Sequence, residues 1–158
     1  MSRQPASASP AHAPLKSKTV ATWAALLLGS VGMHRFYLYG SSDRLAWLFP
    51  WPTLVGLYGV RRMGELGQDD RLAWFLMPIL GVMLVIAMAS GIIYGLTADE
   101  KWDVQHNGGN KSPASGWAVI IGVVLCLLIG GTCLMSTIAF SAQRYFESQV
   151  EAAQAISQ

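Results

Sequence analysis

Hydrophobic residues along the chain fall into four runs that short polar segments separate. The runs lie at about Thr19–Met33, Leu45–Val60, Trp74–Leu96 and Trp117–Phe140. The last two each hold roughly 23 or 24 residues without a charged side chain, enough as helix to cross about 30 Å of hydrocarbon. They predict two transmembrane helices, and the two shorter runs predict two more.

Composition supports a membrane protein. Hydrophobic residues make up 53% of the 158 residues and charged residues 13%, whereas soluble domains carry roughly 25% charged residues. We therefore expect an all-α integral membrane protein of about four transmembrane helices, with the lipid bilayer as its first partner. The net charge of +2 is too small and too dispersed to indicate a nucleic-acid partner.

The chain divides into four predicted parts. Residues 1–15 are rich in Pro, Ala and Ser and predict a disordered tail. Residues 16–63 predict a first helical pair, and residues 64–140 a second pair with an outer loop at 97–116. Residues 141–158 predict an amphipathic helix on the inner membrane surface or against a partner, with a frayed tail as the alternative.

The distribution of basic residues predicts the orientation. With four crossings, the inner side carries Arg3, Lys16, Lys18, Arg61, Arg62, Arg71 and Arg144, and the outer side carries Arg35, Arg44, Lys101 and Lys111. The excess of basic residues on the inner side over the outer side agrees with the positive-inside rule. We expect both termini in the cytoplasm and a location in the bacterial cytoplasmic membrane.

The stretch "GSVGMHRFYLYG", Gly29 to Gly40, places a histidine and an arginine after an apolar run. The run before it is only about 22 Å long as helix, so Arg35 would reach the far interface and could send its guanidinium to lipid phosphates. Aromatic residues are typical of that interface. An interfacial anchor is the favoured interpretation, and a buried functional pair of His34 and Arg35 is the alternative.

The same stretch resembles the opening of the TM-two domain family, small membrane domains named for two transmembrane helices. The matching residues, a Lys-rich lead followed by Gly-x-x-Gly and His-Arg-Phe-Tyr, are Lys16, Lys18, Gly29, Gly32, His34, Arg35, Phe36 and Tyr37. The resemblance covers about residues 16–63, and the remainder is similar to extended forms in uncharacterised bacterial membrane proteins. It implies a fold and a location without a settled chemistry.

The sequence departs from the family pattern in two places. Tyr39 precedes the expected glycine, and Arg61 with Arg62 stands where the family tends to end its second helix with an acidic residue. The acidic residue that the family pattern would offer as a partner for Arg35 is therefore missing from this sequence.

The pentapeptide "DRLAW" occurs twice, at Asp43–Trp47 and at Asp70–Trp74. An aspartate at this position can cap a helix and face its positive end, so we expect two helix starts, with a duplicated functional element as the alternative. Pro50 and Pro52 interrupt the second run. They predict either a kinked crossing or a re-entrant hairpin, because proline removes a helical hydrogen bond.

Small residues recur every four positions in both long runs. They form one predicted ridge at Ala87, Gly91 and Gly95 and another at Gly122, Cys126 and Gly130. Such ridges let helices approach closely. We expect the two long helices to pack on each other, and self-association would use the same residues.

Candidate chemistry is sparse. Asp99, Glu100, Asp103 and His106 in the 97–116 loop could ligate a metal only if the loop folded back, and they lack the regular spacing of strong zinc sites. A solvated loop is favoured, with no metal, cofactor or catalytic set expected.

These features predict a non-enzymatic multi-pass membrane protein that acts through contacts, as an accessory, assembly or sensing subunit. Its partner would be a membrane protein or a second copy. The alternative is a small transporter or channel that uses His34, Arg35 and the proline-broken second span, since discontinuous helices often line transport sites.

Overall fold

The structure is a computed structural model that describes residues 14–157. The predicted disordered tail lies almost entirely outside this range. The described residues form helices and no strand, which confirms the all-α prediction. In chain order the helices are α1 (Lys18–Leu28), η1 (Gly29–Val31), α2 (Met33–Tyr39), α3 (Arg44–Leu48), α4 (Pro50–Leu66), α5 (Arg71–Leu96), α6 (Asp99–His106) and α7 (Trp117–Ile156).

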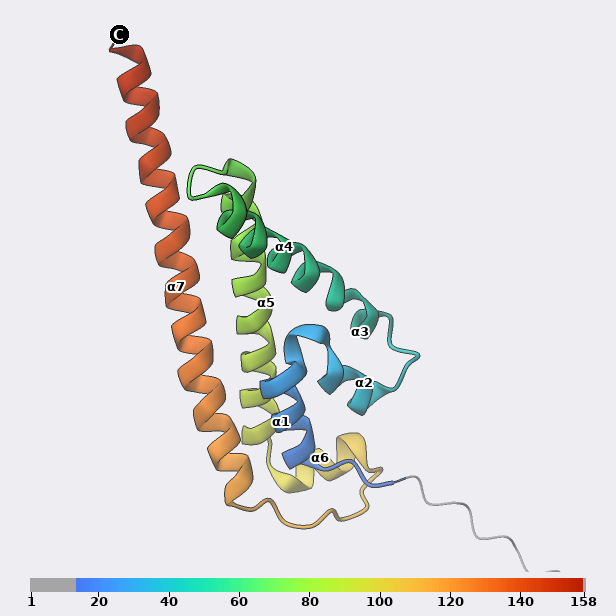
Figure 1. Cartoon of the computed structure of the whole chain (residues 1–158). Coiled ribbons are helices and arrows are strands. Elements are labelled where there is room, and N and C mark those ends of the chain that lie inside the picture. The colour runs from blue at the N-terminus through green and yellow to red at the C-terminus, as the bar shows by residue number, and fades with distance from the viewer. Residues whose placement is uncertain (1–13, 158) are drawn as a thin grey trace, which may run out of the picture.

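Helices α5 and α7 form the long axis of the molecule and run in opposite directions (Figure 1). Both are long and apolar enough to cross a membrane. The predicted C-terminal segment is no separate element, because α7 continues without a break from Trp117 to Ile156. At 1.5 Å per residue it is about 60 Å long, well beyond a bilayer core.

The first predicted crossing is instead a hairpin. Helix α1 ends at Leu28, and Gly32 turns the chain with a φ of +85°, which a residue with a side chain rarely adopts. Helix α2 then returns to the start of α1. There the Ser17 backbone N–H donates to Tyr37 Oη at 2.8 Å, and Lys16 Nζ donates to the Leu38 carbonyl.

The second predicted crossing is broken at Phe49 but does not turn back. Pro50 occupies the first position of α4, where its missing N–H costs no helical hydrogen bond. Together α3 and α4 cover residues 44–66 and run obliquely to the start of α5 (Figure 1). Gly56 and Gly59 pack there against Leu80 and Leu76. Of the two alternatives for this run, the kinked helix describes it.

The two small-residue ridges face each other, and α1 also packs against them. A Cβ added to Gly91 would lie 2.6 Å from Cys126 Sγ and 3.3 Å from the Ala25 Cβ of α1. A Cβ on Gly122 would lie 2.9 Å from Thr22 Cγ2, and one on Gly95 would lie 2.1 Å from Val123 Cγ2. Gly29 approaches fully buried Ala87 in the same way. The ridges therefore bring α5 and α7 together, and they also contact α1.

The ends of the molecule differ from the expected four-span arrangement. That arrangement separates residues 16–18 from the 97–116 segment by a membrane. In the structure Lys18 Nζ lies 2.6 Å from Asp99 Oδ1, so both segments lie at the same end of α5 and α7. The C-terminal part of α7 lies at the opposite end, where Arg71 contacts Glu151. Two long apolar helices leave the four-span count unconfirmed.

Adjacent glycines of α7 allow a matched test of the packing. A Cβ on Gly130 would lie 2.8 Å from Met88 Cβ, whereas one on Gly131 would meet nothing within 4 Å. We expect Gly130→Ile to lower the melting temperature of the detergent-solubilised protein, by an overpacking cost of about 1–3 kcal/mol. Gly131→Ile should melt like the wild type. Equal melting temperatures for the two variants would contradict the helix contact.

Candidate functional site at the junction of two broken helices

Two helix breaks lie next to each other in the molecule. One is η1, between α1 and α2, and the other is at Phe49, between α3 and α4. We call this the broken-helix junction and define it by Ser30, Gly32, His34, Phe49 and Thr53. Thr53 Oγ1 donates to the Ser30 carbonyl at 2.5 Å and so joins the two breaks. A Cβ on Gly32 would lie 2.9 Å from the Ala46 carbonyl oxygen. Only glycine therefore fits both the turn and the contact.

His34 is the buried centre of this junction, with only 1% of its surface exposed. Its ring lies edge-on to Phe49, with 5.6 Å between ring centroids, and 5.8 Å from the Tyr94 ring of α5. Among the described residues, Nδ1 of His34 has no hydrogen-bond partner. A buried polar atom without a partner carries a free-energy cost, so His34 is an unusual choice if packing is its only role.

Arg35 has a carboxylate partner within the chain. Its Nε lies 2.8 Å from Asp43 Oδ2, and its guanidinium stands 5.2 Å from the centre of the Tyr39 ring. The hydrogen bond from Arg35 is the main cause that lowers the pKa of Asp43. This geometry differs from the favoured interpretation of a free interfacial anchor. It also supplies the acidic partner that the family analogy did not.

Asp43 was missed as the partner of Arg35, although the sequence held a signal. An arginine stands eight residues before each DRLAW copy, Arg35 before Asp43 and Arg62 before Asp70. Both pairs form ion pairs in the structure. The second lowers the pKa of Asp70, mainly through the hydrogen bond from Arg62.

The two DRLAW copies also begin their helices in the same way. Asp43 and Asp70 accept from the backbone N–H of the leucine two residues later, which confirms the predicted caps. Trp47 Nε1 donates to the Ser41 carbonyl at 3.0 Å, and Trp74 Nε1 donates to the Gln68 carbonyl at 2.7 Å. The repeated unit is thus an arginine, a capping aspartate and a tryptophan that together fix one helix start.

The remaining motif residues connect the junction to its surroundings. Phe36 packs edge-on against Trp47, with 5.3 Å between ring centroids. Tyr37 Oη accepts from the backbone of Ser17 and so holds the hairpin closed.

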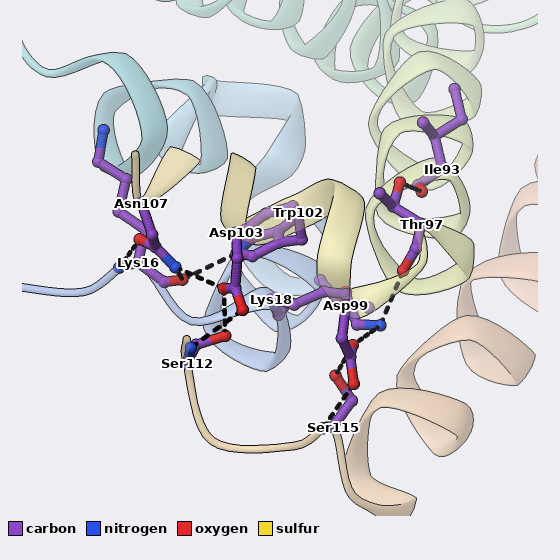
Figure 2. Close-up of polar contacts among 11 residues, drawn as sticks. Lys16, Lys18, Ile93, Thr97, Asp99, Trp102, Asp103, Asn107, Ser112 and Ser115 are labelled. Atoms are coloured by element: carbon purple, nitrogen blue, oxygen red, sulfur yellow. Dashed lines mark hydrogen bonds and ion pairs between the residues drawn. The ribbon is translucent and has the colours of Figure 1, made fainter. Parts of the chain in front are cut away.

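The 97–116 segment is more ordered than the solvated loop that the sequence favours. It contains α6 and folds over the start of α1, and we call it the α6 cap. Trp102, 1% exposed, donates from Nε1 to the Lys16 carbonyl at 2.8 Å, and Asn107 Oδ1 accepts from the Lys16 backbone N–H at 2.7 Å. Figure 2 shows these contacts together with those of Lys18.

Asp99 and Asp103 of the cap bind serines of the cap, and Asp99 also binds Lys18 of α1. Asp103 accepts from Ser112 and Asn107 (Figure 2), and the hydrogen bond from the Ser112 side chain is the main cause that lowers the pKa of Asp103. Asp99 accepts from Lys18 Nζ and from Ser115, and these bonds lower its pKa to about 2, with Lys18 first. Within the part of the chain that the structure describes, no three His, Cys, Asp or Glu side chains form a group that could hold a metal.

Comparisons with protein-family models, with curated proteins and with solved structures find no match to this chain. The sequence and the geometry above therefore carry the functional argument.

The ion pair of Arg35 with Asp43 can be tested by substitution. The planar guanidinium donates from Nε and at the same time lies over the Tyr39 ring, a combination that the terminal ammonium group of lysine does not reproduce. We expect Arg35→Lys to lose most of the thermal stability that Arg35→Leu loses. The exposed neighbour Arg44 provides the control, and Arg44→Leu should melt like the wild type. A lysine variant as stable as the wild type would restore the interfacial-anchor interpretation.

The link between the α6 cap and α1 should depend on pH. The folded pKa of Asp99 is lowered from 3.8 to about 2, so this residue stabilises the fold above its ordinary pKa, and the contribution is lost as pH falls toward 2. Asp99→Asn should lower the melting temperature near neutral pH. The gap to the wild type should narrow between about pH 5 and pH 2.

The exposed neighbour Glu100 serves as the control for this series, with Glu100→Gln expected to follow the wild type throughout. A gap between Asp99→Asn and the wild type that stays constant over the whole range would show that the carboxylate does not hold the cap.

Proposed function

We propose that the protein is a non-enzymatic integral membrane protein that acts through contacts, as an accessory, assembly or sensing subunit. The outward-facing apolar surface of α5 and α7 carries this proposal. In the most apolar 18-residue stretch of each helix, only 22% is buried inside the molecule. Phe75, Leu127 and Met135 are 75%, 62% and 69% exposed. Water disfavours so large an apolar surface, whereas lipid solvates it.

The use of the charged residues supports a role in contacts. Arg35 pairs with Asp43, Arg62 with Asp70 and Lys18 with Asp99. Each pair fixes a helix start or joins two segments, so its charged groups stabilise the fold. A partner would then bind either the exposed apolar helix faces or the ends that these pairs hold in place. A second copy of the chain or another membrane protein is the expected partner.

The arrangement of the helix ends supports a revised topology for this proposal. The α1–α2 hairpin would enter the membrane and return, while α3–α4, α5 and α7 would cross it. The end that holds the α6 cap carries Lys16, Lys18, Arg35, Arg44, Lys101 and Lys111, and the other end carries Arg61, Arg62, Arg71 and Arg144. By the positive-inside rule the α6 cap would be cytoplasmic and the end of α7 would lie outside.

The resemblance to the TM-two domain supports the membrane location in this proposal and extends it to the bacterial cytoplasmic membrane, whereas the two transmembrane helices of that family differ from the single crossing of residues 16–63 in the revised topology. In that interpretation the hallmark residues build the α1–α2 hairpin: Gly32 makes the turn, and Tyr37 closes the hairpin.

The small transporter or channel remains the second candidate, because of the broken-helix junction. Two discontinuous helices meet around a buried histidine whose Nδ1 has no partner among the described residues. Unwound segments of this kind often bind substrates or ions. Flux into liposomes that His34→Gln and Arg35→Ala both abolish, with Arg44→Ala unaffected, would favour this candidate. Equal flux with and without the protein would leave the contact-based proposal.

Reporter fusions test the leading proposal and its topology. Reporters before Lys16 and between Gly108 and Gly109 should lie on the same side of the membrane, and a reporter after Gln158 on the opposite side. The chain itself should stay in the membrane fraction under alkaline extraction. Reporters at the first two positions on opposite sides would contradict the hairpin, and release of the chain by alkali would contradict the membrane proposal.

A further inference from the structure

The contacts that hold the α6 cap on the start of α1 gather at Lys16, as Figure 2 shows. The Lys16 backbone N–H donates to Asn107 Oδ1 at 2.7 Å, and the Lys16 carbonyl accepts from Trp102 Nε1 at 2.8 Å and from Asn107 Nδ2 at 3.3 Å. Lys16 Nζ donates to the Leu38 carbonyl near the end of α2. A cap that moved away from Lys16 would therefore release the start of α1.

His106, the last residue of α6, packs between the cap and the α1–α2 hairpin. Its ring is stacked on the Trp102 ring, with 4.1 Å between centroids and an angle of 25° between the ring planes. The Tyr39 ring of α2 lies on another side, 6.3 Å from His106 between centroids. Nδ1 of His106 is buried and has no hydrogen-bond partner among the described residues.

This position favours the neutral ring of His106. A protonated imidazole donates from both ring nitrogens, and a buried N–H group without an acceptor carries a free-energy cost. Burial is the main cause that lowers the pKa of His106 from its ordinary value of 6.5. The Trp102 carbonyl opposes this shift but forms no hydrogen bond with Nδ1 in the structure, and the positive charge of Lys16 adds to the shift.

The other groups around His106 supply no free counter-ion. Arg35 brings a second positive charge to this side, because its guanidinium lies 5.2 Å from the centre of the Tyr39 ring. Asp103, almost one turn earlier in α6, is already bound within the cap. The face of the Trp102 ring attracts a cation, but the net effect of the surroundings is to lower the pKa of His106.

We propose that His106 is a pH-sensitive latch of the α6 cap, closed while the ring is neutral and open once it is protonated. Opening withdraws the cap from Lys16. It also removes Trp102 from Tyr94 of α5, a ring that packs on His34 of the broken-helix junction. The latch gives the sensing role in the proposed function a concrete signal, although the latch itself does not depend on that role.

Acid favours the open cap because an exposed histidine binds a proton more tightly than His106 does in the closed cap. The contribution of the neutral ring to the closed cap is complete above about pH 6.5 and is lost as pH falls from there toward the lowered pKa. One such group raises the ratio of open to closed cap by up to about tenfold for each pH unit in that window.

Hydrogen exchange of the Lys16 backbone amide in the detergent-solubilised full chain measures this ratio. That amide donates across the contact to Asn107, so it exchanges when the cap opens, even if opening is rare. Its exchange rate is divided by that of an unstructured peptide at the same pH, which removes the intrinsic pH dependence. The resulting protection should be constant above about pH 7 and should fall several-fold between about pH 6.5 and pH 5.5.

Two variants without a titrating ring serve as tests of the cause. His106→Phe keeps an aromatic ring on Trp102, and its protection should not change over the same pH range. His106→Gln should also lose the pH dependence, so the test survives if one variant fails to fold. Glu100→Gln should keep the pH dependence of the wild type, because Glu100 is an exposed residue of the same helix.

Two results would overturn the latch: protection of Lys16 in the wild type that does not change with pH, or variants of His106 that respond to pH as the wild type does. Either result leaves the proposed membrane function in place. A chain found in the soluble fraction contradicts the proposed function, whereas the pH dependence of the cap is measured independently of it.

Discussion

The close approach of α1, α5 and α7 at Gly91 is the contact on which the rest of the structure depends. A Cβ at this position would overlap Cys126 of α7 and press on Ala25 of α1. In the proposed membrane location, lipid is as apolar as the helices, so their association would rely on backbone approach and close packing rather than on the hydrophobic effect. If α5 and α7 were further apart, the α1–α2 hairpin would lose the surface on which α1 packs. The broken-helix junction, which packs His34 against Tyr94 of α5, would lose one wall.

Polar contacts then fix the ends of this three-helix arrangement. At one end the α6 cap binds Lys16 and Lys18 and holds the start of α1. The repeated arginine and aspartate pairs fix the starts of α3 and α5, and each aspartate also caps its helix. A single carboxylate thus balances a charge and satisfies a backbone N–H group. This double use suits a protein with few charged residues, because unpaired polar groups are costly near hydrocarbon.

The sequence predicted the features that local pattern determines. Two charge-free runs predicted α5 and most of α7, and the aspartates of DRLAW predicted two helix starts. The hairpin was missed because a run of about 15 apolar residues is too short for a clear crossing, and only the φ of Gly32 decides its direction. The α6 cap was missed because its contacts join residues such as Lys18 and Asp99, 81 positions apart. The partner of Arg35 was within reach, since the same spacing recurs at Arg62 and Asp70.

Disulfide formation in intact membranes tests the helix contact most directly. A cysteine at position 91 should form an intramolecular disulfide with native Cys126, because a Cβ there lies 2.6 Å from Cys126 Sγ. The measurement uses Gly91→Cys with Cys133→Ser, oxidised in the membrane and separated without reductant. The control is Gly91→Cys with Cys126→Ser, in which Cys133, two helical turns away, should stay unpaired with position 91. The predicted result is a monomer with an intramolecular disulfide that reductant removes and that forms only in the variant that keeps Cys126. Disulfide-linked dimers in place of that monomer would contradict it and assign the small-residue ridges to self-association.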